Sequence, residues 1–497
     1  MRKRFEQQTS LGITPVSEVK FPLRSRDELP PVLKALQHIF VTAELNQQVF
    51  SILEERVSKG KKKTGRPGMD LWHILVLAVV RHTLDTNWDR LEDMANYHTL
   101  LRQILGIHVE RFETEGIEFS YQAIVDNVSF IDEELLQKIN SLVVEHGQNL
   151  LKKKGEEALR LKTDSYVLQT NVHFPTDLNL LWDALRKGMD TICKLTLVTD
   201  LDGWRKIKSI RRNTKSQFRA TSHQVFRGKS EEQKKRCVQN YLHTATTLHE
   251  RFADIIHHPP RVLKGVDNKR ILVLIEELKY YNDFVKKQMD LVERRLLKGE
   301  KIEASEKVHS IFEPHTEWIS KGKMHPSVEL GHLLLITTDQ HQFIMDYRVM
   351  ENEKDAAQIG PLIERIENKL SGKAIHSHSF DKGFYSKDNY DRLKQTEVEN
   401  IIMPKKGKLN KEEKERESGK TFKALRNAHS GVESNINMLE HHGLNRCADK
   451  GLHGYKRYVG LSVLAYNLHI LGNHLIAQER EKEKQRQKQR ERYRLAA

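Results

Sequence analysis

Alternation of apolar and polar residues predicts β-strands in two regions of the chain. The first strand is expected at 158–172. Four more are expected much later, at 328–338, 342–350, 373–380 and 400–406. A short polar turn separates the second strand from the third, as in a hairpin. A helix closed by Gly372 is expected at 355–372, between the third and fourth strands.

Apolar residues recur at helical spacing through most of the remaining sequence. Before the first strand, the pattern predicts a helical segment at 30–57. Three short helices are predicted within 69–107, and a further helix is predicted at 120–151. Asp85–Asn87 are good N-cap types, so the second of the three short helices is expected to begin there. Residues 177–300 have a mostly helical and highly charged pattern, and helices at 426–441 and 458–475 close the fold.

The order of these elements is strand, long helical insertion, strand, strand, helix, strand, strand, helix, helix. Without the insertion, a three-stranded antiparallel meander is followed by a helical crossover to further strands. This order is compatible with a ribonuclease-H-like core, although many mixed α/β folds share part of it. We predict an α/β fold with such a core, a long and mainly helical insertion after its first strand, and a helical N-terminal region.

Length and local composition divide the chain into several parts, because 497 residues are too many for one simple core. The predicted parts are an N-terminal helical region with a basic arm (1–64), a helix-turn-helix-like domain (65–115), a helical connector (116–157), the catalytic core (158–176 and 305–475), a helical insertion (177–304) and a charged tail (476–497). A helix pair beside a basic arm suits a DNA groove, but similar pairs are common in ordinary bundles.

The charge balance is basic, with 83 Lys and Arg against 68 Asp and Glu and a formal net charge of +15. A basic surplus concerns partners rather than fold, and nucleic acid is the first candidate, which would make the N-terminal helical region a DNA-binding region. The alternative is a merely soluble basic protein. The segment "SKGKKKTGRPG" (58–68) is either a phosphate-binding arm or a solvated hinge.

Cysteine usage and hydropathy narrow the protein class. Three widely spaced cysteines give no disulfide framework and no CxxC pair, which argues against a zinc finger and fits a reducing compartment. The first residues lack the apolar stretch of a signal peptide, and no run reaches the ~20 apolar residues of a membrane span. We expect a soluble, cytoplasmic protein.

Three acidic residues lie where the predicted core would bring them together. Asp164 is in the first strand, Asp381 directly follows the fourth strand, and Glu433 is in the first turn of a later helix. Three converging carboxylates repel one another unless cations are bound, and oxygen ligands in an open site suit Mg²⁺ or Mn²⁺. Two such ions about 4 Å apart can activate the attacking oxygen and stabilise the leaving oxygen of a phosphodiester.

Each of these residues also has an ordinary structural explanation. An Asp at a strand end is often a cap or turn residue, and a Glu in the first turn of a helix is favoured by the helix dipole. His376, His378 and His429 are not at a zinc-binding spacing, and we interpret them as polar surface or site-edge residues.

Three stretches together resemble bacterial insertion-sequence transposases of the DDE type: "TDSYVLQTNVHFPTD" (163–177), "SFDKGFYSKDN" (379–389) and "SGVESNINMLEHHGLNRCADKGLHGYKRYVGLSVLAYNLHILG" (430–472). The likeness is greatest to the group often filed as "not classified yet" (ISNCY). Residues 65–106 and 310–339 are also similar to parts of these enzymes, so the resemblance extends over most of 65–475.

The resemblance implies a function and a set of catalytic residues. Asp164, Asp381 and Glu433 match the Asp, Asp-x-Gly-[FY] and Glu motifs of the family, and would bind two Mg²⁺ or Mn²⁺ ions. The enzyme would cleave DNA at transposon ends and join the 3′-OH ends to target DNA by two-metal-ion phosphoryl transfer. Its partners would be double-stranded terminal inverted repeats and target DNA, it would act as a dimer on paired ends, and it would associate with the nucleoid when bound to DNA.

The sequence departs from several related groups near the glutamate. Those groups carry Tyr seven residues before it, Arg four before it and Lys seven after it, where this chain has Arg426, His429 and Glu440. Arg426 and Arg446 are candidates to supply the missing positive charge. The full set of predicted DNA-binding residues is Lys61, Lys62, Lys63, Arg66, Lys382, Lys405, Lys406, Arg426, His429 and Arg446.

Two other functions stay open from the sequence. One is a domesticated DNA-binding protein that has kept the fold and lost catalysis. The other is a ribonuclease-H-like nuclease that cuts without joining. The presence of all three carboxylates argues against the first, and the N-terminal helical region argues for a protein that holds specific DNA ends.

Overall fold

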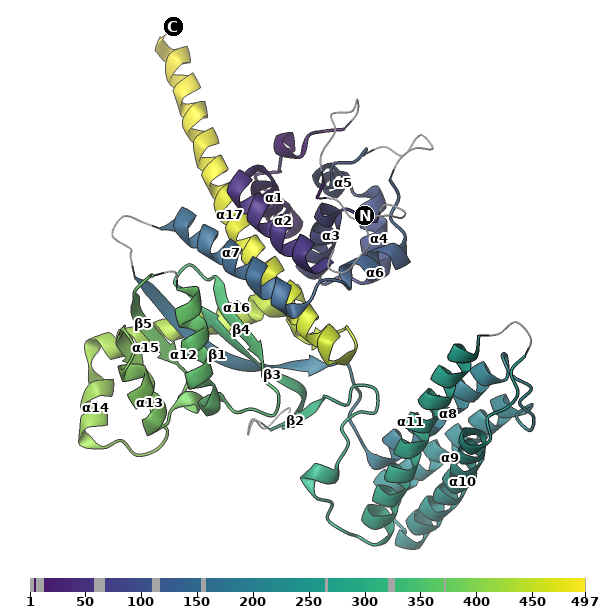
Figure 1. Cartoon of the computed structure of the whole chain (residues 1–497). Coiled ribbons are helices and arrows are strands. Elements are labelled where there is room, and N and C mark those ends of the chain that lie inside the picture. Colours follow the sequence, from purple (N-terminus) through teal and green to yellow (C-terminus); the bar gives the residue numbers. More distant parts are fainter. Residues whose placement is uncertain are drawn as a thin grey trace. The chain divides into compact units, whose positions relative to one another are not determined.

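The computed structural model describes residues 4–5, 13–57, 68–109, 117–152, 158–263, 267–320, 327–370 and 372–496. The chain divides into two compact units. The first combines Met1–Asn171 with Ile319–Ala497, and the second is Val172–Trp318 (Figure 1). Each unit is described separately.

Among the described residues of the first unit, seven α-helices precede the sheet: α1 (Leu29–Val41), α2 (Ala43–Val57), α3 (Leu71–Thr83), α4 (Trp88–Tyr97), α5 (Thr99–Leu105), α6 (Tyr121–Val128) and α7 (Glu133–Leu151). The Asn87 side chain accepts a hydrogen bond from the backbone N–H of Arg90 and caps α4, as the sequence predicts. Every residue of α3 is buried. A helix buried on all sides cannot enter a DNA groove, so α3 is a core helix.

The sheet is formed by β1 (Leu159–Thr170), β2 (Glu317–Ile319), β3 (Glu329–Thr338), β4 (Ile344–Val349), β5 (Ile375–Phe380), β6 (Val398–Ile402) and β7 (Arg446–Cys447). Its main order is β2-β3-β1-β5-β6, with β4 paired to β3 and β7 paired to β1. β1 and β4 are both antiparallel to β3, whereas β5 and β6 continue the sheet parallel to β1, and β7 is also parallel to β1. β1, β3, β4 and β5 lie where apolar alternation predicts them, whereas β6, predicted at 400–406, begins at Val398 and ends at Ile402.

Helices cover both faces of this sheet. On one face, Tyr166 and Leu168 of β1 share a hydrophobic cluster with Leu439 and Tyr455. These partners belong to α16 (Gly431–Leu439) and α17 (Gly451–Ala496). On the other face, Leu161 shares a cluster with residues of α12 (Ile359–Lys369) and α13 (Lys387–Lys394). The first unit is therefore a mixed α/β layered structure with more helix than strand.

The helices after β6 differ from the prediction, because the single helix expected at 426–441 is divided between α15 (Lys420–His429) and α16. The segment 405–420, expected as a solvated loop, contains α14 (Lys411–Ser418), which begins with a capping box between Asn410 and Glu413. It is followed by α15. The capping box lies within a run of Lys and Glu. Because this run has no apolar stripe, hydrophobic periodicity does not predict the helix.

The last helix, α17, is continuous from the core into the charged tail, and its C-terminal part projects from the unit (Figure 1). Among the described residues it alone is long and apolar enough to cross a membrane by length and composition. Of its apolar window, 78% is buried inside the protein. This burial is that of a core helix, packed against α1, α3 and α7.

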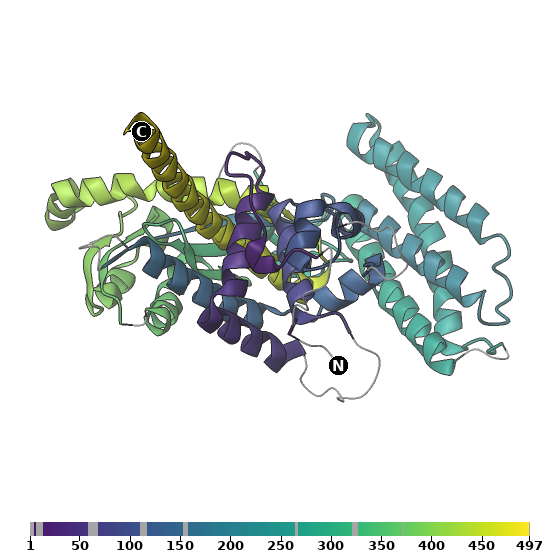
Figure 2. The ribbon, with the colours of Figure 1, turned by 90° about the horizontal axis from the view of Figure 1, so that it is seen from above.

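The second unit is a bundle of four helices, α8 (Asp177–Leu195), α9 (Ile207–Arg227), α10 (Glu231–His257) and α11 (Asn268–Val292), which run alongside one another (Figure 2). It has its own hydrophobic cluster, drawn from all four helices. Within it the rings of Trp182 and Phe218 stack with centroids 5.8 Å apart. The charged pattern of this region therefore belongs to amphipathic helices with a common core.

Candidate active site

Asp164 and Asp381 are brought together by the pairing of β1 with β5. In this parallel pair Thr163 lies opposite Phe380. Asp164 directly follows Thr163, and Asp381 directly follows Phe380. The two aspartates therefore occupy neighbouring positions and point to the same face of the sheet. Asp164 is half-buried and Asp381 is exposed, at the N-cap of the short helical turn Lys382–Phe384.

Glu433 approaches this face from α16, which runs along β1. A Cβ built at Gly431 would lie 2.9 Å from the Nζ atom of Lys162. Near the other end, burial and the charge of Glu440 raise the pKa of Tyr166 well above its ordinary value. From 431 to 440 a helix rises about 13 Å, and from 162 to 166 a strand rises about 13 Å. α16 therefore packs along β1 on the face that carries Asp164, and Glu433 is exposed.

The three carboxylates are not gathered into one cluster. Within the described ranges, no group of three or more His, Cys, Asp or Glu side chains is placed to hold a metal ion. One Oδ atom of Asp164 accepts the backbone N–H of Ser165 at 2.7 Å. The residues fit a divalent cation in donor chemistry, since carboxylate oxygens are the ligands of Mg²⁺ and Mn²⁺. Side-chain rotation of accessible carboxylates would have to complete the site.

A polar layer on the same face supports the two aspartates. The Ser379 hydroxyl and His429 Nδ1 are 2.9 Å apart, which attaches the end of α15 to β5. Burial lowers the pKa of His429 to about 4, against a smaller opposing effect of Asp381. Burial also lowers the pKa of Lys162. At neutral pH His429 is therefore an uncharged residue at the edge of the site.

A second polar network lies on the opposite face of the same strands. The Thr163 hydroxyl is 2.7 Å from the Thr337 hydroxyl and 2.8 Å from Nε2 of His378. Burial lowers the pKa of His378 to about 3, so this histidine is neutral. The network links β1, β3 and β5 directly beneath Asp164, and therefore fixes the strand that carries it.

Asp355 is a carboxylate near the site that the sequence analysis missed. Its Oδ1 accepts a hydrogen bond from the Ser165 hydroxyl at 2.7 Å. Its Oδ2 would lie 3.0 Å from a Cβ built at Gly383. Asp355 thus contacts the neighbours of both Asp164 and Asp381. Its sequence context, a polar segment before a helix, resembles any helix start, so only the pairing of distant segments reveals it.

The predicted DNA-binding residues have different environments. Lys61, Lys62, Lys63 and Arg66 lie outside the described residues. The exposed members of the set are Lys382, Lys406, Arg426 and Arg446. Arg446 donates to the Gln169 side chain at 3.2 Å. Lys405 donates to both carboxylate oxygens of Glu413 at 2.9 Å, so its charge is already paired. His429 faces the sheet, as described above.

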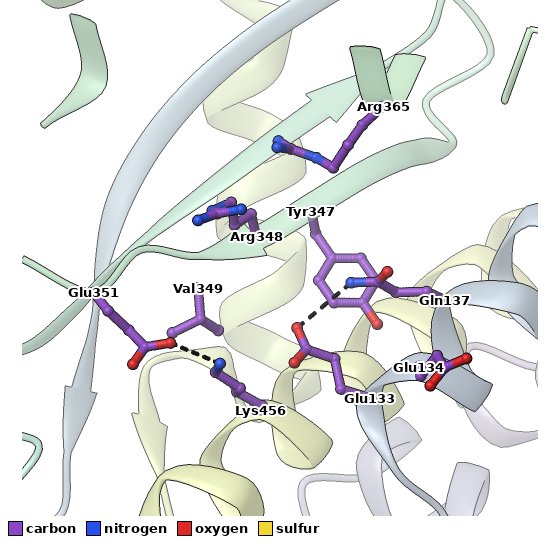
Figure 3. A pocket seen from close by; sticks show the side chains of 9 residues that line it. All are labelled: Glu133, Glu134, Gln137, Tyr347, Arg348, Val349, Glu351, Arg365 and Lys456. Carbon is purple, nitrogen blue, oxygen red and sulfur yellow. Dashed lines mark hydrogen bonds and ion pairs between the residues drawn. The ribbon is translucent and has the colours of Figure 1, made fainter. Parts of the chain in front are cut away.

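A separate pocket of about 310 Å³ lies between α7, β4 and α17 (Figure 3). Its acidic and basic side chains are largely paired. Lys456 binds Glu351 at 2.7 Å, and Arg365 binds Asp346 at 2.9 Å. Burial raises the pKa of Glu133, which also lines the pocket. These pairs tie α12 to β4 and α17 to the residue Glu351 just after β4, which is a structural role.

Comparison with known families adds one match. Residues 307–468 match the family model described as "Transposase DDE domain". This range contains Asp381 and Glu433 and begins after Asp164. No curated protein and no solved structure matches the chain.

Proposed function

Because it carries a transposase DDE domain, this chain is an insertion-sequence DDE transposase, and we propose that it cleaves transposon ends and joins their 3′-OH groups to target DNA. Transposition requires DNA binding, and the basic surplus of the chain agrees with this. Two copies would act on paired ends.

We assign catalysis to Asp164, Asp381 and Glu433. The observation that carries this assignment is the pairing of Thr163 with Phe380, which makes the two aspartates neighbours at one face of the sheet. The strand order β4-β3-β1-β5-β6, antiparallel in its first three members and parallel afterwards, supports a ribonuclease-H-like core.

The three carboxylates would hold two Mg²⁺ or Mn²⁺ ions. When bound, such ions stabilise charge on the attacking and leaving oxygens of a phosphodiester. The chain's own contribution is positional. The Thr163 and Asp355 contacts fix β1 and the turn after β5, and the Ser379–His429 contact fixes the end of α15 ahead of Glu433.

The test is a double substitution, Asp164→Asn with Asp381→Asn, assayed on DNA carrying the sequences that flank the gene. We expect Mg²⁺-dependent end cleavage to be lost and DNA binding to be retained, because Asn keeps the side-chain volume and removes the charged oxygen ligands. Asp388→Asn, an exposed acid in the first turn of α13, is the matched control and should cleave normally.

The outcomes separate the candidate functions. Cleavage by the double variant would refute the residue assignment. Binding without cleavage in the unmodified protein would indicate a domesticated DNA-binding protein. Cleavage with no joined products would indicate a nuclease. Glu433→Gln, assayed alone, tests the helix residue separately from the two aspartates.

A further inference from the structure

Helix α9 of the second unit lies in a segment that contains no acidic residue. Between Gly203 and Ser230 there is no Asp or Glu, although about one residue in seven of the whole chain is acidic. The same segment has nine Lys and Arg residues: Arg205, Lys206, Lys208, Arg211, Arg212, Lys215, Arg219, Arg227 and Lys229. Protein surfaces normally intersperse both signs of charge, so this segment is unusual for a solvated face.

The two sides of α9 have different roles. Its apolar side packs into the bundle through the buried Ile207 and through Phe218, which stacks on Trp182. The other side exposes four cations at spacings of four, three and four residues, followed by His223; we call Lys208, Arg212, Lys215 and Arg219 the basic stripe. At these spacings the four side chains lie along one face of the helix.

The basic stripe lacks the acidic partners that other cations of the bundle have. Arg211, beside the stripe, binds Asp190 at 2.8 Å, and Lys194 binds Glu277 at 3.1 Å. Over the described part of the chain, none of the four stripe residues makes an ion pair or a side-chain hydrogen bond. Like charges three and four residues apart destabilise a helix, so the stripe costs stability when nothing is bound.

We propose that the basic stripe of α9 binds the phosphate backbone of duplex DNA without reading its sequence. From Lys208 to Arg219 the stripe is about 16 Å long, and duplex DNA presents one negative charge per about 1.7 Å of its axis. Among the exposed residues between the four cations, which include Asn213 and Ser216, there is no aromatic residue, and the exposed Phe226 lies beyond the stripe at the C-terminal end of α9. Sites for single strands add aromatic rings on which bases stack, so the stripe fits a duplex.

This inference rests on the proposed function for the identity of the nucleic acid, and it assigns the helical insertion a role in holding DNA. The four cations would release counterions from the phosphates they contact. The affinity of the chain for DNA should therefore fall as salt rises, and the stripe should add to the steepness of this fall. In a plot of log K against log salt, removing the stripe should reduce the magnitude of the slope by about 3 to 4.

The test uses the full-length chain with Lys208, Arg212, Lys215 and Arg219 all replaced by Gln, which favours helix. Fluorescence anisotropy with a random-sequence 30-base-pair duplex is measured from 50 to 200 mM salt. The matched control replaces Lys269, Lys279, Lys286 and Lys287 of α11 by Gln. Those lysines are exposed but interspersed with Glu276, Asp283 and Asp290, and their loss changes net charge equally.

For the α9 variant alone we expect at least tenfold weaker binding at 50 mM salt and the reduced slope. Neither variant should melt at a lower temperature than the unmodified protein, because removing the like charges of the stripe does not destabilise the helix. Equal affinities and slopes in the two variants would overturn the proposal. A stripe-dependent preference for duplex RNA of the same sequence would overturn the assignment to DNA. Because binding is measured without cleavage, loss of the stripe effect and loss of catalysis are separate results.

Discussion

Asp355 and Gly383 show how single residues position the candidate active site. Asp355 receives the Ser165 hydroxyl and lies against the backbone of Gly383, so one carboxylate braces the segments after both aspartates. A Cβ at position 383 would press against this carboxylate. A side chain at position 383 would have to displace either Asp355 or the turn that follows Asp381.

We predict that Gly383→Ala lowers end cleavage by tenfold or more while costing about 1–3 kcal/mol of stability. The new Cβ would be 3.0 Å from Oδ2 of Asp355, closer than ordinary van der Waals contact. Cleavage rate and urea denaturation measure the two effects. Adding Asp355→Ala removes the obstructing carboxylate and should restore part of the stability. Normal cleavage by Gly383→Ala would show that this contact does not position the site.

At the scale of elements, α17 holds the first unit together. It covers the sheet on one side and packs against α1, α3 and α7 on the other. Gly472 is the position of closest approach to α1, because a Cβ there would lie 1.8 Å from the carbonyl oxygen of Pro31. The two helices can pack at this distance only without a side chain at position 472.

Gly472→Ala is therefore expected to lower the free energy of unfolding by about 1–3 kcal/mol through overpacking. Gly454→Ala in the same helix is the control, since its nearest neighbour, the Cβ of Asp449, is 3.5 Å away. Alanine favours helix over glycine, so the control should be neutral or slightly more stable. Urea denaturation compares the two variants. Equal stability of both would contradict the close α1–α17 contact.

At the scale of the whole molecule, the N-terminal helices and the α/β part form one unit with a buried polar junction. His82 of α3 is 2.8 Å from the Ser462 hydroxyl of α17. His442, at a kink within the segment Glu440–Leu444, is 3.4 Å from the backbone oxygen of His82. Burial lowers the pKa of His442 to about 4 and, together with the charges of Arg81 and Arg457, lowers that of His82.

These neutral histidines predict loss of stability in mild acid. His442 has a folded pKa of about 4 and an ordinary value near 6.5, so the unfolded chain binds its proton first. Its contribution is fully present above about pH 6.5 and is lost as the pH falls toward 4. By pH 5 the loss from this residue is on the order of 2 kcal/mol.

Urea denaturation at pH 7 and pH 5 measures this effect. His442→Asn keeps a polar side chain but does not titrate, so its stability should fall less between the two pH values than that of the unmodified protein. Ser209→Asn, a half-buried position in the second unit, serves as a variant with an unchanged pH response. An equal fall in the His442→Asn variant would exclude this histidine as a source of acid sensitivity.

Much of the fold could be predicted because the signals are local. Alternation along 159–170 and 329–338 marks β1 and β3, and the N-cap preference of Asn87 marks the start of α4. The helix α14 was missed because its residues are almost all polar, and a helix without an apolar stripe has no periodicity to detect.

The description of the candidate site depended on both the sequence and the tertiary structure. Its acidic residues and the motif resemblance come from the sequence by itself, as do the strand positions and the basic segment that contains α9. Only the tertiary structure decided that Asp164 adjoins Asp381, that His429 is buried against Ser379, that Lys405 is already paired, and that Asp355 lies beside them. Side-chain periodicity reports the neighbours of a residue along the chain, whereas strand register, burial and ion pairing are set by segments far apart in sequence.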